Sequence, residues 1–162
     1  MSASSIAILE DVKKQLLSRG LKMTTAESCT GGWLAQQVTS LAGSSEWFDC
    51  GFVTYSNSSK QNLLGVNPAT LKEHGAVSEQ TAIEMARGAL DRADADVAIS
   101  VTGIAGPDGG TPDKPVGTVW IAWVVPERPP VARCFHFDGD REMVRLETVR
   151  AAFAGLLELI VA

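Results

Sequence analysis

The residues best suited to chemistry lie in the segment 43–60, which reads GSSEWFDCGFVTYSNSSK. Ser45 precedes a mostly apolar run, residues 48–55, that is typical of a buried strand; Tyr55 ends this run and Lys60 closes the polar turn that follows. A serine beside a lysine forms a nucleophile without histidine, provided that burial or a neighbouring cation keeps the amine neutral. If the strand runs back across a sheet edge, Ser45, Tyr55 and Lys60 converge as a catalytic group. The alternative is a strand between two polar loops, and the residues alone favour it.

A second informative segment, residues 27–32 (ESCTGG), lies between a short threonine-rich strand and a helix that opens at Trp33. The free N–H groups and the positive dipole end of a helix favour an anion at such a turn. It is not a Walker A loop, because the spacing and the Lys-Ser/Thr ending are missing. Simple helix capping by a hydroxyl is an equally good interpretation. The candidate binding residues here are Ser28, Thr30, Gly31 and Gly32.

A glycine-rich loop, residues 102–110, follows the apolar run 96–101, which is typical of a central strand buried on both faces. Ligands bind at the carboxyl ends of strands in open α/β sheets, and glycine lets the backbone approach a ligand closely. The loop therefore adds Thr102, Gly103 and Gly106 to the candidate substrate-binding residues, although the same glycines could simply build a long turn.

Two arginines, Arg141 and Arg145, lie one turn apart at the start of the last expected helix and therefore share a face. At that spacing they could clamp a phosphate or a carboxylate. They could equally pair with Glu142 or be solvated, and the sequence alone favours the solvated face. Both arginines are kept as candidate substrate-binding residues.

The composition limits the possible classes of protein. A chain of 162 residues with 45% hydrophobic and 20% charged residues predicts one soluble domain, residues 1–162. The net charge of −5, without a basic block, argues against non-specific nucleic-acid binding. We find no signal-peptide pattern and no apolar run that could span a bilayer, so no membrane association is expected.

Cysteine and histidine are too sparse for a metal site. The three cysteines, Cys29, Cys50 and Cys134, are widely spaced and lack a C-x-x-C partner, which favours reduced thiols in a cytoplasmic protein. The two histidines, His74 and His136, are too few for a histidine-rich cage. We expect no metal and no cofactor.

The order of the expected elements is α-β-α-β-α-α-β-β-β-α, which predicts an α/β fold: a three-layer α/β/α sandwich with a mixed, mostly parallel sheet. The last two strands are expected to pair as an antiparallel hairpin. The elements are helix 6–19, strand 21–26, a helix from 33 through 41, strand 48–55, a short helix from 68 through 71, a longer helix that begins at 78, strands 96–101, 116–125 and 131–137, and a helix that begins after 140.

Six blocks of sequence together resemble the CinA C-terminal domain family, and they span nearly the whole chain in the family's order. They are TTAESCTGG (24–32), GSS with GFVTYSN and the closing lysine (43–60), HGAVS (74–78), SVTGIAGPDGG (100–110), KPVGTV (114–119) and GDRE (139–142). The resemblance implies a nicotinamide-nucleotide amidohydrolase, which converts nicotinamide mononucleotide and water to nicotinate mononucleotide and ammonia. Longer members carry an additional N-terminal domain, and this chain resembles the stand-alone form.

The resemblance also implies catalytic residues. The family's proposed group is a serine helped by a lysine and a tyrosine, which match Ser45, Lys60 and Tyr55 of this sequence. Ser44 and Ser28 are the alternative nucleophiles, because the first is adjacent and the second lies in an equally distinctive motif.

Two other functions remain open at this point. The domain could be a non-catalytic nucleotide-binding module linked to competence or DNA damage, although a pure binder has no use for a serine–lysine pair. It could also be a phosphohydrolase, which would normally need a carboxylate-bound metal; Asp108 and Asp113 are present but are typical turn formers. Four tryptophans and the apolar content leave room for a homo-oligomer.

Overall fold

A five-stranded sheet organises the computed structural model, which describes residues 2–162. In chain order the elements are α1 (Ala3–Ser18), β1 (Met23–Glu27), α2 (Trp33–Thr39), the 3-10 turn η1 (Ser44–Glu46), β2 (Phe48–Val53), α3 (Asn57–Leu64), α4 (Pro68–His74), α5 (Glu79–Arg92), β3 (Val97–Gly103), β4 (Thr118–Val124), β5 (Val131–His136) and α6 (Arg141–Val161).

The strand order in the sheet is β2-β1-β3-β4-β5. Strand β1 pairs in parallel with β2 and β3, whereas β4 pairs antiparallel with β3 and β5. The expected mixed sheet and the β4–β5 hairpin are confirmed, although parallel and antiparallel ladders are equally represented. The central strands β1 and β3 are buried along almost their whole length, as expected for strands covered on both faces.

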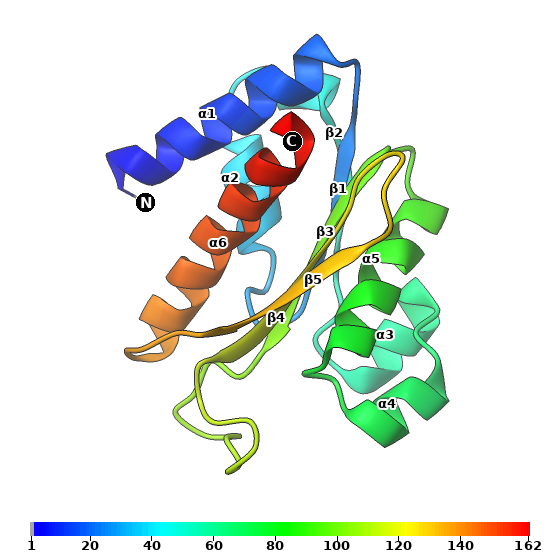
Figure 1. The fold of residues 1–162 in the computed structure, drawn as a ribbon, viewed down its shortest axis with the longest axis vertical. Coiled ribbons are helices and arrows are strands. Elements are labelled where there is room, and N and C mark those ends of the chain that lie inside the picture. The colour runs from blue at the N-terminus through cyan, green and yellow to red at the C-terminus, as the bar shows by residue number, and fades with distance from the viewer. Residues whose placement is uncertain (1) are drawn as a thin grey trace.

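Helices cover both faces of the sheet and complete the expected three layers (Figure 1). Helices α1, α2 and α6 lie on one face, and α3, α4 and α5 lie on the other. The main core fills the space between the sheet and α6, where Trp123 of β4 donates from Nε1 to the carbonyl of Ala152 at 2.8 Å. Gly155 faces this indole so closely that any side chain there would collide with it.

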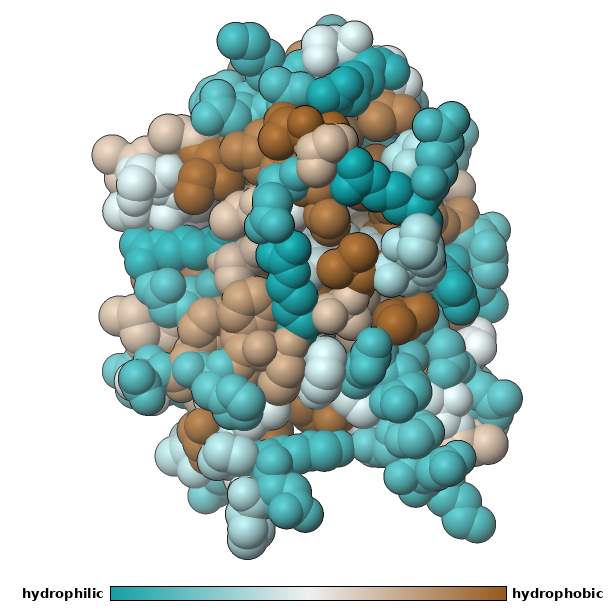
Figure 2. All heavy atoms as spheres, viewed as in Figure 1, coloured by the Kyte–Doolittle hydropathy of each residue, from teal (hydrophilic) through white to brown (hydrophobic). Residues whose placement is uncertain are grey.

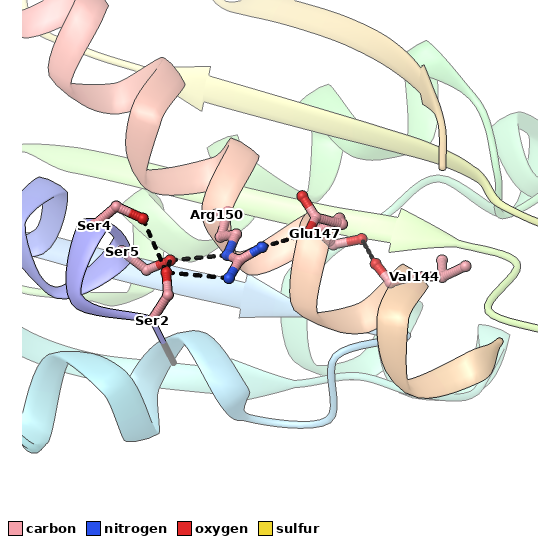
Figure 3. Close-up of polar contacts among 7 residues, drawn as sticks. Ser2, Ser4, Ser5, Val144, Glu147 and Arg150 are labelled. Carbon is pink, nitrogen blue, oxygen red and sulfur yellow. Dashed lines mark hydrogen bonds and ion pairs between the residues drawn. The ribbon is translucent and has the colours of Figure 1, made fainter. Parts of the chain in front are cut away.

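A polar cluster fixes the start of α1 against α6 (Figure 3). The Arg150 guanidinium donates to the hydroxyls of Ser5, at 2.8 Å, and Ser2, at 3.1 Å, and also pairs with the Glu147 carboxylate. Helix α1 is therefore held by directional hydrogen bonds as well as by its apolar stripe of Leu9, Val12 and Leu16.

The segment between β2 and α4 differs from the sequence interpretation. It was expected to be a polar turn that ends at Lys60, but residues 57–64 form α3. Ser56 caps this helix by accepting from the Ser59 N–H at 3.1 Å, and Gly65 ends it in the left-handed region at φ 68°. Lys60 therefore projects from a helix rather than from a turn.

Hydrophilic side chains cover much of the face viewed in Figure 2, with apolar patches between them. Within residues 2–162, none of the helices is both long and apolar enough to cross a membrane.

Candidate active site

Lys60 is an unusually buried lysine, with 1% of its surface exposed. It projects from α3, and its Nζ lies 2.7 Å from the carbonyl oxygen of Thr54 and 3.2 Å from that of Tyr55, the two residues that follow β2. Its third neighbour is the Oγ of Ser28, at 2.9 Å. A helix and the end of an adjacent strand thus hold the amine against one serine hydroxyl.

Burial changes the proton affinity of this amine. Desolvation by burial lowers the pKa of Lys60 from 10.5 to about 8. A neutral amine has two N–H donors and one lone pair. In the ammonium form, Nζ donates to Ser28 Oγ as well as to both carbonyls. In the neutral form, the two carbonyls can only accept, so they take the two N–H groups, and the lone pair is left for the Ser28 hydroxyl. The geometry is that of a general base beside its serine.

Ser28 directly follows β1, at the carboxyl end of the strand, and is buried. Its N–H donates to the carbonyl of Val101 on β3 at 3.0 Å, and its carbonyl accepts from the Gly31 N–H at 3.1 Å. The turn can close this tightly because Gly31 and Gly32 have φ values of 60° and 103°, which favour glycine. The serine is therefore held by its backbone on a strand-to-helix turn.

The buried carboxylate of Glu27 occupies the other side of this turn. Its Oε1 accepts from the Thr30 hydroxyl at 2.6 Å and the Leu34 N–H at 2.8 Å, and its Oε2 accepts from the Ala35 N–H at 3.1 Å. The N-terminus of α2 thus already has an anion, supplied by the protein itself. Capping by Ser28 or Thr30 was one expectation for this helix, and the structure assigns the capping to Glu27.

Sequence reasoning did not find Glu27 as a contributor to the site. The available signal was an acidic residue at a strand end, directly before the turn that opens a helix, where the helix dipole favours a negative charge.

Both arginines of α6 bond main-chain carbonyls beside the Ser28 turn or the glycine-rich loop; Arg141 is nevertheless exposed, as expected for a solvated face, whereas Arg145 is partly buried. Arg145 donates from Nε to the carbonyl of Cys29 at 3.0 Å and from Nη2 to that of Thr30 at 3.1 Å, and its guanidinium lies 5.4 Å from the centroid of the Trp33 ring. Arg141 donates from Nη1 to the carbonyl of Gly106 at 2.7 Å. The first turns of α6 therefore join the Ser28 turn to the glycine-rich loop.

Of the three candidates expected in the glycine-rich loop, Thr102 and Gly103 instead form the end of β3, because the strand continues through Gly103 in its pairing with β4, and only Gly106 follows the strand. Thr102 is buried, and its hydroxyl donates to the carbonyl of Ala76 at 2.8 Å. Gly103 ends β3 opposite Val119, where a side chain would strike β4. Gly106, at φ 84°, presents its carbonyl to Arg141. Of these residues, Gly106 is the one directly bonded to a candidate site side chain.

Ser45 lies away from Lys60. It is exposed in η1, before β2, whereas Lys60 comes after the strand. A strand of this length separates its two ends by roughly 15–20 Å. The expected convergence of Ser45, Tyr55 and Lys60 is therefore not found, and the same separation applies to Ser44. The serine beside Lys60 is Ser28.

Tyr55 contacts Lys60 through its main chain and Arg141 through its hydroxyl. Its carbonyl bonds Lys60, whereas its hydroxyl accepts from Nη2 of Arg141 at 3.2 Å. The side chain is 62% exposed. Within residues 2–162, the hydroxyl is bonded to this arginine and to neither Ser28 nor Lys60.

Carboxylates do not gather at this site in a metal-binding pattern. In the part of the chain that the structure describes, no group of three or more His, Cys, Asp or Glu side chains is placed to hold a metal ion. Asp108 in the glycine-rich loop and Asp113, three residues beyond it, are both exposed. Cys29 is a buried free thiol beside Ser28, and burial raises its pKa to about 11, which keeps it protonated.

The sequence of this chain is similar to a known family and to proteins of that family. The family model described as CinA C-terminal domain matches residues 6–160. Nicotinamide-nucleotide amidohydrolase PncC of Escherichia coli strain K12 is 52% identical over 147 residues, covering 91% of this chain and 89% of that protein. A CinA-like protein of Chlorobaculum tepidum is 51% identical over 161 residues, covering 96% of this chain but only 38% of that protein.

Solved structures have the same fold. The competence/damage inducible protein CihA from Agrobacterium tumefaciens matches with a TM-score of 0.94 and 43% identity, covering 98% of this chain and 97% of that one. A CinA superfamily protein from Klebsiella pneumoniae matches with a TM-score of 0.93 and 41% identity, covering 97% and 98% of the two chains.

Proposed function

Because this chain belongs to the CinA C-terminal domain family, and is similar to nicotinamide-nucleotide amidohydrolases over most of its length, we propose that it hydrolyses the carboxamide of nicotinamide mononucleotide to nicotinate mononucleotide and ammonia. The observation that carries the proposal is the buried contact of 2.9 Å between Nζ of Lys60 and Oγ of Ser28. Amide hydrolysis needs an activated nucleophile and a base that later protonates the leaving amine, and this pair supplies both.

In the proposed mechanism, Ser28 is the nucleophile instead of Ser45. Neutral Lys60 takes the Ser28 proton as Oγ forms a bond to the carboxamide carbon. The Lys60 ammonium then protonates the amide nitrogen, the C–N bond breaks and ammonia leaves. Water attacks the resulting acyl-enzyme with Lys60 again accepting the proton; the ester bond to Ser28 then breaks as the Lys60 ammonium returns this proton to Ser28 Oγ, which releases nicotinate mononucleotide and restores the neutral amine.

The oxyanion that forms during attack needs hydrogen-bond donors. The N–H groups of Cys29 and Thr30 follow the nucleophile directly and donate to no protein atom within residues 2–162. The N–H after a nucleophile at a strand-to-helix turn is a common oxyanion donor. Loss of one such donor typically lowers the rate by about 10²–10³-fold. Glu27 and Arg145 hold this turn in place from its two sides.

The phosphate of the substrate needs positive partners. Arg141 and Arg145 each use part of their guanidinium to bond main-chain carbonyls, which fixes the side chains and leaves further N–H donors for a ligand. We assign the phosphate to this pair. The adjoining residues are Thr30, Gly31 and Gly32 in the Ser28 turn, Thr102 and Gly103 at the end of β3, and Gly106 in the loop, and glycine allows close approach of a ligand there.

The test is an assay of purified protein with nicotinamide mononucleotide, in the presence of EDTA, that measures ammonia, nicotinate mononucleotide and inorganic phosphate together. The proposal predicts equal amounts of ammonia and nicotinate mononucleotide. Release of phosphate without ammonia would identify a phosphohydrolase instead. Binding of the nucleotide by folded protein without any turnover would support the binding module.

A further inference from the structure

Tyr55 is bonded through both its main chain and its hydroxyl, yet the residue remains exposed. Its main-chain carbonyl accepts from Nζ of Lys60 at 3.2 Å, and its hydroxyl accepts from Nη2 of Arg141 at 3.2 Å. Arg141 is itself fixed by the carbonyl of Gly106, at 2.7 Å. Despite these restraints, 62% of the residue is open to solvent. Buried contacts do not explain an aromatic ring that is fixed in this way.

These contacts place the Tyr55 main chain beside the Lys60 amine and the Tyr55 hydroxyl beside Arg141. The Tyr55 backbone and Oγ of Ser28 are both bonded to the Lys60 amine. At its other end the ring reaches Arg141, one helical turn before Arg145, which bonds the carbonyls of Cys29 and Thr30. The residue thus connects the two groups: its backbone is bonded to the Lys60 amine, and its side chain ends at Arg141.

The substrate class proposed above has to bridge the same two groups. Its carboxamide must reach Ser28 and its phosphate must reach the arginines, so its pyridinium ring lies between them. That ring carries a permanent positive charge, and the surrounding side chains Lys60, Arg141 and Arg145 are basic. A cation in this space needs an electron-rich partner, and the face of a tyrosine ring is such a partner.

We propose that the face of the Tyr55 ring binds the positively charged pyridinium ring of the substrate, which makes Tyr55 a specificity-determining residue that selects a cationic nicotinamide ring over an uncharged one. The inference rests on the proposed function. Arg141 holds the phenol by its oxygen, at the edge of the ring, so the faces stay free for the ligand. The hydroxyl orients the ring and does not carry a proton between Ser28 and Lys60.

Two substitutions separate the ring face from the hydroxyl. Tyr55→Phe keeps the aromatic face and removes the hydroxyl, whereas Tyr55→Leu keeps an apolar side chain and removes the aromatic face. Each is made in the Ser28→Ala protein, so that binding is measured without turnover. Calorimetric titration gives the Kd for nicotinamide mononucleotide and for its reduced dihydro form, which has the same phosphate and carboxamide on an uncharged ring.

The readout is the ratio of the two Kd values in each protein. We expect the Ser28→Ala protein to prefer the cationic ligand, Tyr55→Phe to keep most of this preference and Tyr55→Leu to lose it by roughly tenfold, the size of a cation–π contact at a partly desolvated site. An unchanged ratio in Tyr55→Leu would overturn the inference. So would an equal loss in both variants, because the hydroxyl would then be the responsible group.

The proposed function is tested separately, by measuring ammonia release by the wild-type protein. If the wild type releases no ammonia while the Kd ratios behave as expected, the reaction is wrong and the cation site stands. If the wild type releases ammonia while the ratio is insensitive to Tyr55→Leu, the reaction stands and the role of Tyr55 is wrong. Failure of folded Ser28→Ala protein to bind the cationic nucleotide also overturns the inference.

Discussion

The two edges of the sheet hold different kinds of polar residue. At the carboxyl edge of β1 and β2, Glu27, Ser28 and Lys60 are all buried, and each is bonded to neighbouring protein groups. At the amino edge Ser45 is exposed in η1, and a cavity of about 450 Å³ lies beside Leu21, Val125 and two arginines, Arg19 and Arg128. Within residues 2–162, the buried contact between a serine and a lysine lies at the carboxyl edge, and the proposed reaction is assigned to that edge and not to the cavity.

This difference follows from the topology. Because β1 and β2 are parallel, the residues after both strands meet at one edge, and the residues before them meet at the opposite edge. Ser28 follows β1 and Lys60 follows β2, so a separation of 32 residues in the chain closes to 2.9 Å between their polar atoms. The candidate site is therefore assigned from the hydrogen bonds of buried Ser28 and Lys60 and not from the position of the cavity.

Of the following changes, replacement of the proposed base Lys60 should reduce the activity most. Lys60→Met removes the amine from the carboxyl edge while keeping the apolar stem, and we expect kcat to fall by about 10²–10⁴-fold, the usual contribution of a general base. Lys22→Met is the matched control, because Lys22 precedes β1 at the amino edge. Equal activity of the two variants in the ammonia assay would contradict the assignment of Lys60.

The dependence of the wild-type rate on pH provides a second test of Lys60 as the general base. Burial lowers the pKa of Lys60 to about 8, and the base is active only when it is neutral. The rate should therefore rise with pH through that pKa, by roughly tenfold between pH 7 and pH 9, and then level off. The measurement is kcat/KM against pH in buffers of constant ionic strength. A rate that is flat or falls across this range would exclude neutral Lys60 as the base.

The smallest effect is expected at Glu27. In Glu27→Gln, the amide oxygen still accepts from Thr30 and Leu34, but the amide nitrogen meets the Ala35 N–H, so two donors oppose each other. We expect a loss of about 1–3 kcal/mol in the free energy of unfolding. The decrease in kcat should be smaller than that of Lys60→Met, because Glu27 touches the turn and not the reacting atoms.

Urea denaturation measures this loss. The control is Glu46→Gln, an exposed position in η1 at the amino edge, which should change the stability by less than about 0.5 kcal/mol. If the two variants are equally stable, the bonds of Glu27 do not hold the turn.

Much of the fold could be predicted from local patterns. The apolar runs of β3 and β4, the β4–β5 hairpin and the Asp140 cap of α6 follow from hydrophobic periodicity and capping residues, and all three are present. Helix α3 was missed because its residues, NSSKQNLL, are mostly polar. Ser56 before it and Gly65 after it were the available signals for its two ends.

The pairing within the site was harder to predict. Lys60 was identified from its residue type, but its partner depends on which strand lies beside β2, and the spacing of residues along the chain does not contain that information. Recognising residues 48–55 as a strand already implied that Ser45 and Lys60 lie at opposite edges. The positions of Arg141 and Arg145 likewise depend on how α6 packs across the sheet ends, which no local pattern records.

The most direct test compares two serines, one at each edge of the sheet. Ser28→Ala and Ser45→Ala proteins are assayed for ammonia release from nicotinamide mononucleotide, after circular dichroism has shown that both are folded. We expect Ser28→Ala to lose activity by more than about 10³-fold, because the nucleophile is removed, while Ser45→Ala stays within about threefold of the wild type. Loss of activity in Ser45→Ala with full activity in Ser28→Ala would contradict the assignment of Ser28 as the nucleophile.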